Sequence, residues 1–184
     1  MPKPDHWICR MAIEHKMIEP FAPEQVRDGG ISYGTSSYGY DFRVTERFLI
    51  PKPTQDGVLD PKAVREDMFT EFIGPHYDLP ARSFCMARTV EYFRIPRDIL
   101  TIATGKSTYS RCGVTLYITP FEPEWEGHAT ITVVNSNNCP VRIYANEGIG
   151  QLIFLEASEV CATSYADKKG KYQAQKDITH AKSG

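Results

Sequence analysis

The sequence lacks the features that would place it in a membrane, outside the cell or on nucleic acid. No apolar run approaches the roughly 20 residues that a membrane-spanning helix needs. The amino-terminal sequence MPKPDHWICR has no signal-peptide pattern. A formal net charge of −2 and a pI near 6.2 give no general attraction to nucleic acid or anionic lipid. We therefore expect a cytoplasmic protein with no nucleic-acid or membrane partner.

Patterns for disulfides and for zinc are also missing. The cysteines are odd in number, form no CxxC pair and are widely spaced, at Cys9, Cys85, Cys112, Cys139 and Cys161. The histidines lack the spacing of metal ligands, and the zinc deaminase signature, H-x-E followed by P-C-x-x-C, is absent. We expect reduced cysteines, most of them in the core, and no protein-bound zinc.

Short strands separated by glycine and proline dominate the pattern. A chain of 184 residues with 41% hydrophobic content predicts one globular domain, residues 1–184. Its β-branched and aromatic segments are Tyr40–Val44, Phe48–Ile50, Ser83–Val90, Leu100–Thr104, Val114–Ile118, Ala129–Val134, Val141–Tyr144 and Gln151–Leu155. They predict a mainly β core, and the pattern alone does not choose between a barrel and a sandwich.

Two short helices are predicted beside these strands. Asp5 is a suitable N-cap for a first helix with apolar residues on one side, which Pro20 and the next proline end. A second is expected from Pro61, with Asp60 as its cap.

The block GKSTYSRCG, residues 105–113, concentrates groups that bind phosphate. Lys106 offers an ammonium, Ser107 a hydroxyl and Arg111 a planar fork of donors. It is not the phosphate loop of nucleotide hydrolases, because the first glycine of GxxxxGK[ST] is missing and residues 114–117 read as a strand. The block therefore predicts phosphate binding in another framework.

Several blocks in the same order resemble the dCTP deaminase family, relatives of the trimeric dUTPases. They are ISYGTSSYGYDFRV, ARTVEYFRIPRDIL, GKSTYSRCG, TPFEPEWEGHAT, IYANEGIGQLIF and KGKYQAQ. The resemblance implies a distorted β-barrel of the dUTPase-like type with a few short helices, assembled as a homotrimer. It also implies a pyrimidine deoxynucleoside triphosphate as ligand, with Mg²⁺ held by phosphate oxygens and water.

The resemblance also carries roles to individual residues. Ser107 and Arg111 align with residues close to the reacting carbon and its water, and Arg111 is expected to reach a neighbouring subunit's site. A tail from about residue 158 to 184 is expected to be mobile and to close over the nucleotide. Glu124 is expected near the sugar, where Trp125 either lies below the ring or belongs to the core. The expected nucleotide-binding set is Lys106, Ser107, Thr108, Arg111, Glu124, Trp125, Tyr165, Lys171 and Gln175.

The departure from the family lies at its catalytic glutamate. Where the family reads roughly T-L-E-F-S-N, this chain reads TITVVN, and Thr132 takes the glutamate's place. Hydrolytic deamination without a metal-bound water needs a carboxylate to move protons, which a threonine hydroxyl cannot do near pH 7. We therefore place Thr132 at the catalytic position and expect altered chemistry.

Three functions remain open at this point. The chain is a dCTP deaminase with a modified site, a nucleotidohydrolase that releases diphosphate from a pyrimidine nucleotide, or a nucleotide-binding trimer without catalysis. Release of ammonia separates the first from the others, and release of diphosphate separates the second from the third.

Overall fold

The computed structural model describes residues 1–53 and 58–182, and strands dominate it. The helical segments are α1 (Asp5–His15), the 3-10 turn η1 (Glu66–Met68) and α2 (Ser107–Arg111). The strands are β1 (Ile18–Glu19), β2 (Gly34–Ser36), β3 (Gly39–Pro51), β4 (Phe69–Ile73), β5 (His76–Leu79), β6 (Phe84–Arg94), β7 (Ile99–Gly105), β8 (Val114–Tyr117), β9 (Glu126–Asn135), β10 (Val141–Tyr144) and β11 (Gly148–Glu156).

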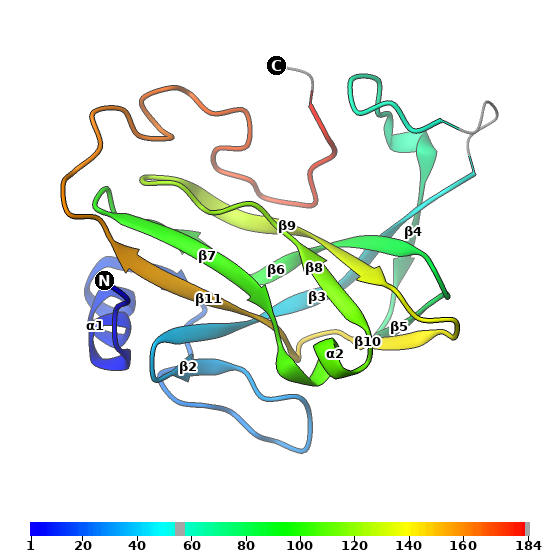
Figure 1. The fold of residues 1–184 in the computed structure, drawn as a ribbon, viewed down its shortest axis with the longest axis horizontal. Coiled ribbons are helices and arrows are strands. Elements are labelled where there is room, and N and C mark those ends of the chain that lie inside the picture. The colour runs from blue at the N-terminus through cyan, green and yellow to red at the C-terminus, as the bar shows by residue number, and fades with distance from the viewer. Residues whose placement is uncertain (54–57, 183–184) are drawn as a thin grey trace.

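The main sheet curls into a nearly closed, distorted barrel. Its strand order is β7-β11-β3-β6-β9-β8, with β1 added on β6 and with β2 and β4 added on β3. The end strands β7 and β8 contact each other, which nearly completes the ring (Figure 1). Strands β10 and β5 form a separate antiparallel pair. The predicted mainly β barrel with a few short helices is thus confirmed, and the homotrimer remains a prediction.

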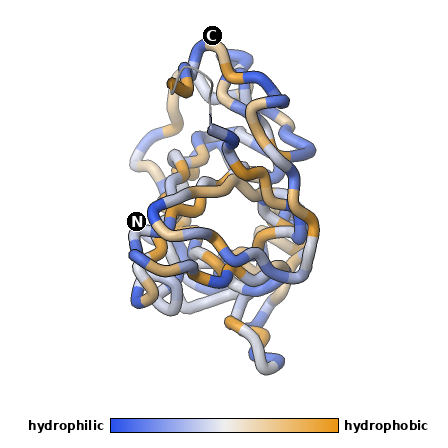
Figure 2. Tube along the Cα trace, turned by 90° about the vertical axis from the view of Figure 1, so that its right-hand side faces the viewer, coloured by the Kyte–Doolittle hydropathy of each residue, from blue (hydrophilic) through white to orange (hydrophobic). Residues whose placement is uncertain are grey.

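Strict alternation along β6 and β9 separates the core from an outward face. In β9 the odd-numbered residues from Gly127 to Asn135 are buried and the even-numbered ones are half-buried. Side chains two residues apart share one face of a strand, so Thr130 and Thr132 both face outward. Viewed at right angles to Figure 1, hydrophobic and hydrophilic residues intermingle along the strands that wind round the barrel (Figure 2).

A buried ion pair lies where β6 bends. Arg43 Nε donates to Glu91 Oε1 at 2.8 Å, and the Arg43 backbone N–H donates to Oε2 at 3.0 Å. Glu91 is fully buried, and its pairing with β9 is interrupted by a register shift between Arg88 and Tyr92. Burial raises the pKa of Glu91, and the guanidinium of Arg43 opposes that rise.

The expected helices differ from those observed. Pro4, not Asp5, occupies the N-cap of α1, and Asp5 lies in the first turn. The helix expected from Pro61 is wrong, because residues 61–62 form a turn in which Asp60 Oδ1 accepts from Lys62 N–H, and η1 follows later. Within the described ranges, no helix is long and apolar enough to cross a membrane.

The buried pair yields a stability prediction. Arg43→Met leaves the Glu91 carboxylate buried without its cation, so we expect a loss of about 3–5 kcal/mol in the free energy of unfolding. Urea denaturation measures the loss. Arg142→Met is the matched control, because Arg142 pairs with Asp78 at an exposed site, where solvent screening leaves the ion pair little effect on the free energy of unfolding. Equal losses in the two variants would contradict the assignment.

Candidate functional site

Helix α2 presents polar side chains at one end of the barrel. The helix follows β7. Lys106 N–H, just before the helix, donates to Ile149 O at 3.0 Å, which attaches the start of the helix to strand β11. Ser107, Thr108 and Arg111 are exposed. Arg111 folds back so that Nη1 donates to Ser107 O at 3.0 Å. The sequence correctly predicted the strand after Gly113 but missed this five-residue helix.

The Lys106 ammonium is already paired inside the chain. It contacts the Asp41 carboxylate, and the two side chains are only 13% and 7% exposed. Asp41 also accepts from Gln151 Nε2 at 3.0 Å and from Gln25 Nε2 at 3.3 Å. Sequence reasoning missed Asp41, although an acidic residue between aromatic residues of a predicted strand was a usable signal. Lys106 can therefore serve a phosphate only by sharing or exchanging its partner.

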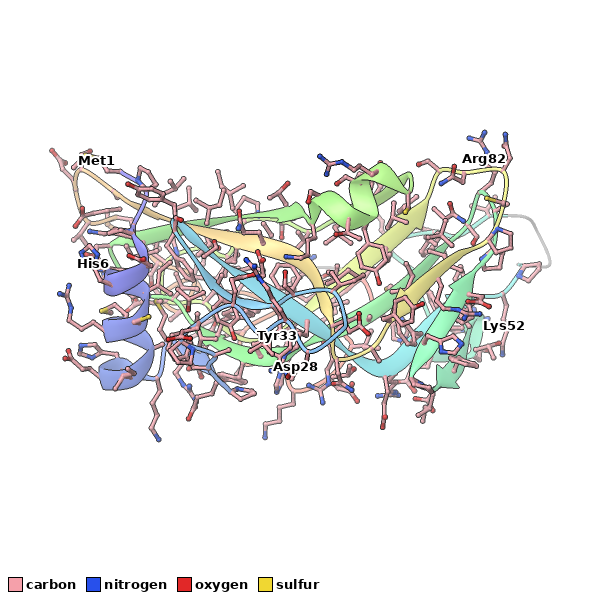
Figure 3. The ribbon with its side chains drawn as sticks, turned by 90° about the horizontal axis from the view of Figure 1, so that it is seen from below. Met1, His6, Asp28, Tyr33, Lys52 and Arg82 are labelled. Atoms are coloured by element: carbon pink, nitrogen blue, oxygen red, sulfur yellow. The ribbon has the colours of Figure 1, made fainter. Side chains whose placement is uncertain are left out.

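A cavity of about 420 Å³ lies near this end of the barrel, between the loop before β2 and the turn before β11. Its lining includes Asp28, Tyr33 and Glu147. Glu147 Oε2 accepts from Ile31 N–H at 2.7 Å, which ties the loop to the turn. Seen from below, Asp28 and Tyr33 lie on the same loop, away from both ends of the elongated molecule (Figure 3). The lining combines these polar and acidic groups with Val26 and Ile31, and Glu147 lies two positions before Ile149, whose carbonyl accepts from Lys106 N–H.

The tail packs against the start of β9. Gln175 bridges to Gly127, and its carbonyl accepts from His128 N–H at 2.9 Å. Gly127 has a φ of +142°, and a β-carbon there would lie 2.7 Å from Gln175 N. Only glycine therefore allows this approach. Burial and the nearby Arg88 lower the pKa of His128, so its imidazole is neutral near pH 7.

The loop before β9 also holds the tail. Trp125 Nε1 donates to Tyr172 O at 2.8 Å, and Gln173 Nε2 donates to Glu124 O at 2.9 Å. Trp125 is 6% exposed, and its ring centroid lies 4.5 Å from that of Phe121. Of the two roles expected for Trp125, the structure supports the core one. The tryptophan also anchors the tail through its indole N–H.

Arg97 organises the charged part of this region. It donates to the Glu124 carboxylate at 2.6 Å and to Asp167 of the tail at 2.7 Å. Tyr165, also in the tail, accepts from Tyr172 N–H at 3.0 Å. Lys171 is exposed, and Arg97 is a residue that sequence reasoning missed because nothing local marks its partners.

The end of the tail crosses the outward face of the sheet. Thr179 N–H donates to Thr130 Oγ1 at 2.9 Å, while Thr130 itself donates to Gln175 Oε1 at 3.2 Å. Asp177 contacts Arg47 on β3 and lies 3.6 Å from Arg88 on β6. Burial opposes ionisation of Asp177, but the Ile178 N–H and the two guanidinium groups outweigh it, so the pKa is lowered.

Thr132 lies on the outward face of β9, two residues after Thr130, which the tail contacts. It pairs with Met86 on β6 and with Tyr117 on β8, and it is half-buried. In Figure 1 the tail crosses the upper side of the barrel, whereas α2 lies at its lower side. In the part of the chain that the structure describes, no hydrogen bond or ion pair joins the predicted residues of α2 to those of the tail. The predicted site residues thus form two groups. The α2 group is Lys106, Ser107, Thr108 and Arg111, and the tail group is Glu124, Trp125, Tyr165, Lys171 and Gln175.

Among residues 1–53 and 58–182, no group of three or more His, Cys, Asp and Glu side chains is placed to hold a metal ion. The two groups instead supply cations, hydroxyls and amides, which suit an anionic ligand with a polar ring.

Known proteins match nearly the whole chain. Residues 3–157 match the family described as dCTP deaminase-like. The dCTP deaminase of Paraburkholderia xenovorans is 55% identical over 96% of both chains, and that of Burkholderia cenocepacia is 54% identical over the same shares. The solved 2′-deoxycytidine 5′-triphosphate deaminase of Agrobacterium tumefaciens matches at a TM-score of 0.63 with 13% identity. That match covers 83% of this chain and 47% of the other, and it speaks for the fold alone.

The contacts of Asp177 yield a prediction about the tail without nucleotide. Asp177→Asn removes the charge that two arginines share, so we expect faster deuterium exchange at the Thr179 amide at pH 7, by several-fold. Because the pKa of Asp177 is lowered, native protection should persist as pH falls to the ordinary aspartate range and vanish only below it. Glu159→Gln, at an exposed tail position, should leave the exchange unchanged. Equal exchange at the Thr179 amide in native and Asp177→Asn protein would contradict the role of Asp177 in holding the tail against the sheet.

Proposed function

This chain belongs to the dCTP deaminase-like family, and on that basis we propose that it acts on dCTP and converts it to dUTP and ammonia. The observation that supports the proposal is that one barrel carries both α2 and the tail contacts on β9, while residues 3–157 match the dCTP deaminase-like family. Curated dCTP deaminases at 54–55% identity over 96% of the chain support the same substrate class.

The α2 group is proposed to hold the triphosphate. Ser107 and Thr108 offer hydroxyls, and Arg111 offers a fork of donors from an exposed helix. Lys106 would exchange Asp41 for a phosphate oxygen when the ligand enters. Mg²⁺, bound by phosphate oxygens and water, would neutralise part of the triphosphate charge.

The active site is proposed to be composite and the protein a homotrimer. The tail lies on one side of the barrel and α2 on the other (Figure 1), and Thr132 follows Thr130, which the tail contacts, on the outward face of β9. A single nucleotide contacts both groups only if a neighbouring copy supplies one of them. Closed cyclic symmetry then gives each interface one equivalent site.

The chemistry at C4 is where Thr132 matters. Water adds to C4 of cytosine, and one of its protons is transferred to N3. The remaining proton of the new C4 hydroxyl is transferred to the amino group, so that the C4–N bond breaks with release of ammonia and the C4 carbonyl forms. Thr132 can orient the water through its hydroxyl but cannot take its proton. Loss of a general acid–base group typically lowers the rate by about 10²–10⁴, so we propose slow deamination by the native chain.

A complementation experiment tests the composite site. Arg111→Ala removes a charge-assisted contact, and truncation after Ser164 removes Lys171 and Gln175; each should weaken dCTP binding about tenfold or more. When the two variants are co-expressed, about a quarter of the sites should combine an intact α2 with an intact tail and bind at native affinity. Titration calorimetry counts these sites. A mixture of Lys106→Ala with Arg111→Ala should restore none, because both changes affect the same half. A light-scattering monomer that binds at full affinity would overturn the trimer.

A second experiment tests the chemistry. Thr132→Glu restores a carboxylate at the family's catalytic position and should raise ammonia release from Mg²⁺-dCTP, by up to about 10²-fold. Thr132→Gln has the same shape without a base and should not. Ammonia release by the native protein near the enzyme median of about 10 s⁻¹ would mean that another residue moves the protons. Release of diphosphate instead of ammonia would identify a nucleotidohydrolase. Release of neither product would identify a nucleotide-binding protein without catalysis.

A further inference from the structure

Two threonines on the outward face of β9 use their hydroxyls differently. Thr130 donates to Gln175 Oε1 at 3.2 Å and accepts from Thr179 N–H at 2.9 Å, so both of its functions are occupied. Thr132 follows on the same face and is half-buried. In the ranges that the structure describes, its hydroxyl has no hydrogen-bond partner, so it is free to donate or to accept.

The surroundings of Thr132 do not bias that choice. Its cross-strand neighbours are Met86 on β6 and Tyr117 on β8, and Val134 follows on the same face. All three are uncharged. The nearest arginine by register is Arg88, which lies opposite Thr130. Its guanidinium is engaged by Asp177 at 3.6 Å and by Thr89 O at 3.2 Å.

This chemistry bears on which base the site accepts. The C4 amino group of cytosine is a hydrogen-bond donor, whereas the C4 carbonyl of uracil is an acceptor. An ionised glutamate only accepts, so it matches cytosine and leaves two acceptors facing each other with uracil. A hydroxyl carries one donor and two acceptor sites, so it matches either base by rotating about its C–O bond.

We infer that the site of this chain binds dCTP and dUTP with comparable affinity. The reason is that Thr132 replaces a carboxylate, which can only accept a hydrogen bond from the group at C4, with a hydroxyl, which can donate or accept one. The inference rests on the proposed function, in which the base lies against β9 at Thr132. It goes beyond it by stating the substrate class: pyrimidine deoxynucleoside triphosphates with either an amino group or an oxygen at C4.

The test compares the two nucleotides on one protein. Stopped-flow displacement of a fluorescent deoxynucleoside triphosphate by Mg²⁺-dCTP or Mg²⁺-dUTP gives both affinities before any turnover. In the native chain we expect dissociation constants within about threefold of each other, and in Thr132→Glu a preference for dCTP of about tenfold or more, because an unmatched buried acceptor is costly. Thr132→Val should weaken both ligands to a similar degree.

Thr115→Glu is the matched control. Thr115 is exposed on β8 opposite Val134, so the Thr115→Glu substitution adds the same charge as Thr132→Glu, but on the neighbouring strand. This charge should weaken both triphosphates and leave their ratio unchanged. A native preference for dCTP above tenfold, or a Thr132→Glu ratio equal to the native one, would overturn the inference while the proposed function stood. Failure of both ligands to bind would overturn the proposed function and the inference together.

Discussion

The pairing of β9 with β6 on one side and β8 on the other is the constraint on which the rest of the structure depends. With both edges hydrogen-bonded, β9 cannot rotate, and its side chains must alternate between the core and the outward face. The inward residues, such as Ile131 and Val133, are fully buried and stabilise the barrel. The outward residues Thr130 and Thr132 are therefore fixed in position without taking part in the core, which frees them to hold the tail or face a ligand.

Sequence reasoning succeeded where structure is local and failed where it is not. The predicted strands are confirmed, because alternation and turn residues are visible within short windows, and the barrel, which only the family resemblance had implied, is confirmed as well. The helix expected at Asp60 and Pro61 is wrong, since a cap and a proline favour a first turn but supply no apolar face to bury. The resemblance led us to expect the residues of the two groups. Only the structure shows that the two groups lie apart on one chain.

The missed residues share a cause. Asp41 contacts Lys106 from 65 positions away, Arg97 reaches Asp167 across 70, and Arg47 reaches Asp177 across 130. Each partner is unremarkable in its own window, where a solvated surface charge is the ordinary outcome for such a residue. Only the fold brings the charges together. Lys106 shows the consequence most clearly, because its charge was correctly noticed but its buried partner was not.

The departure at Thr132 leaves the contacts between the outward face and the tail unchanged. The carboxyl-terminal segment still binds β9 through Gly127, His128 and Thr130, each through backbone or hydroxyl groups that a change at position 132 leaves intact. The tail's own charge at Asp177 is balanced by Arg47 and Arg88, which do not involve position 132. Threonine in place of a carboxylate therefore removes proton transfer and changes the group offered to the base, while the contacts that hold the tail remain. Tail binding and the chemistry at the base are separable here because the strand assigns them to different residues.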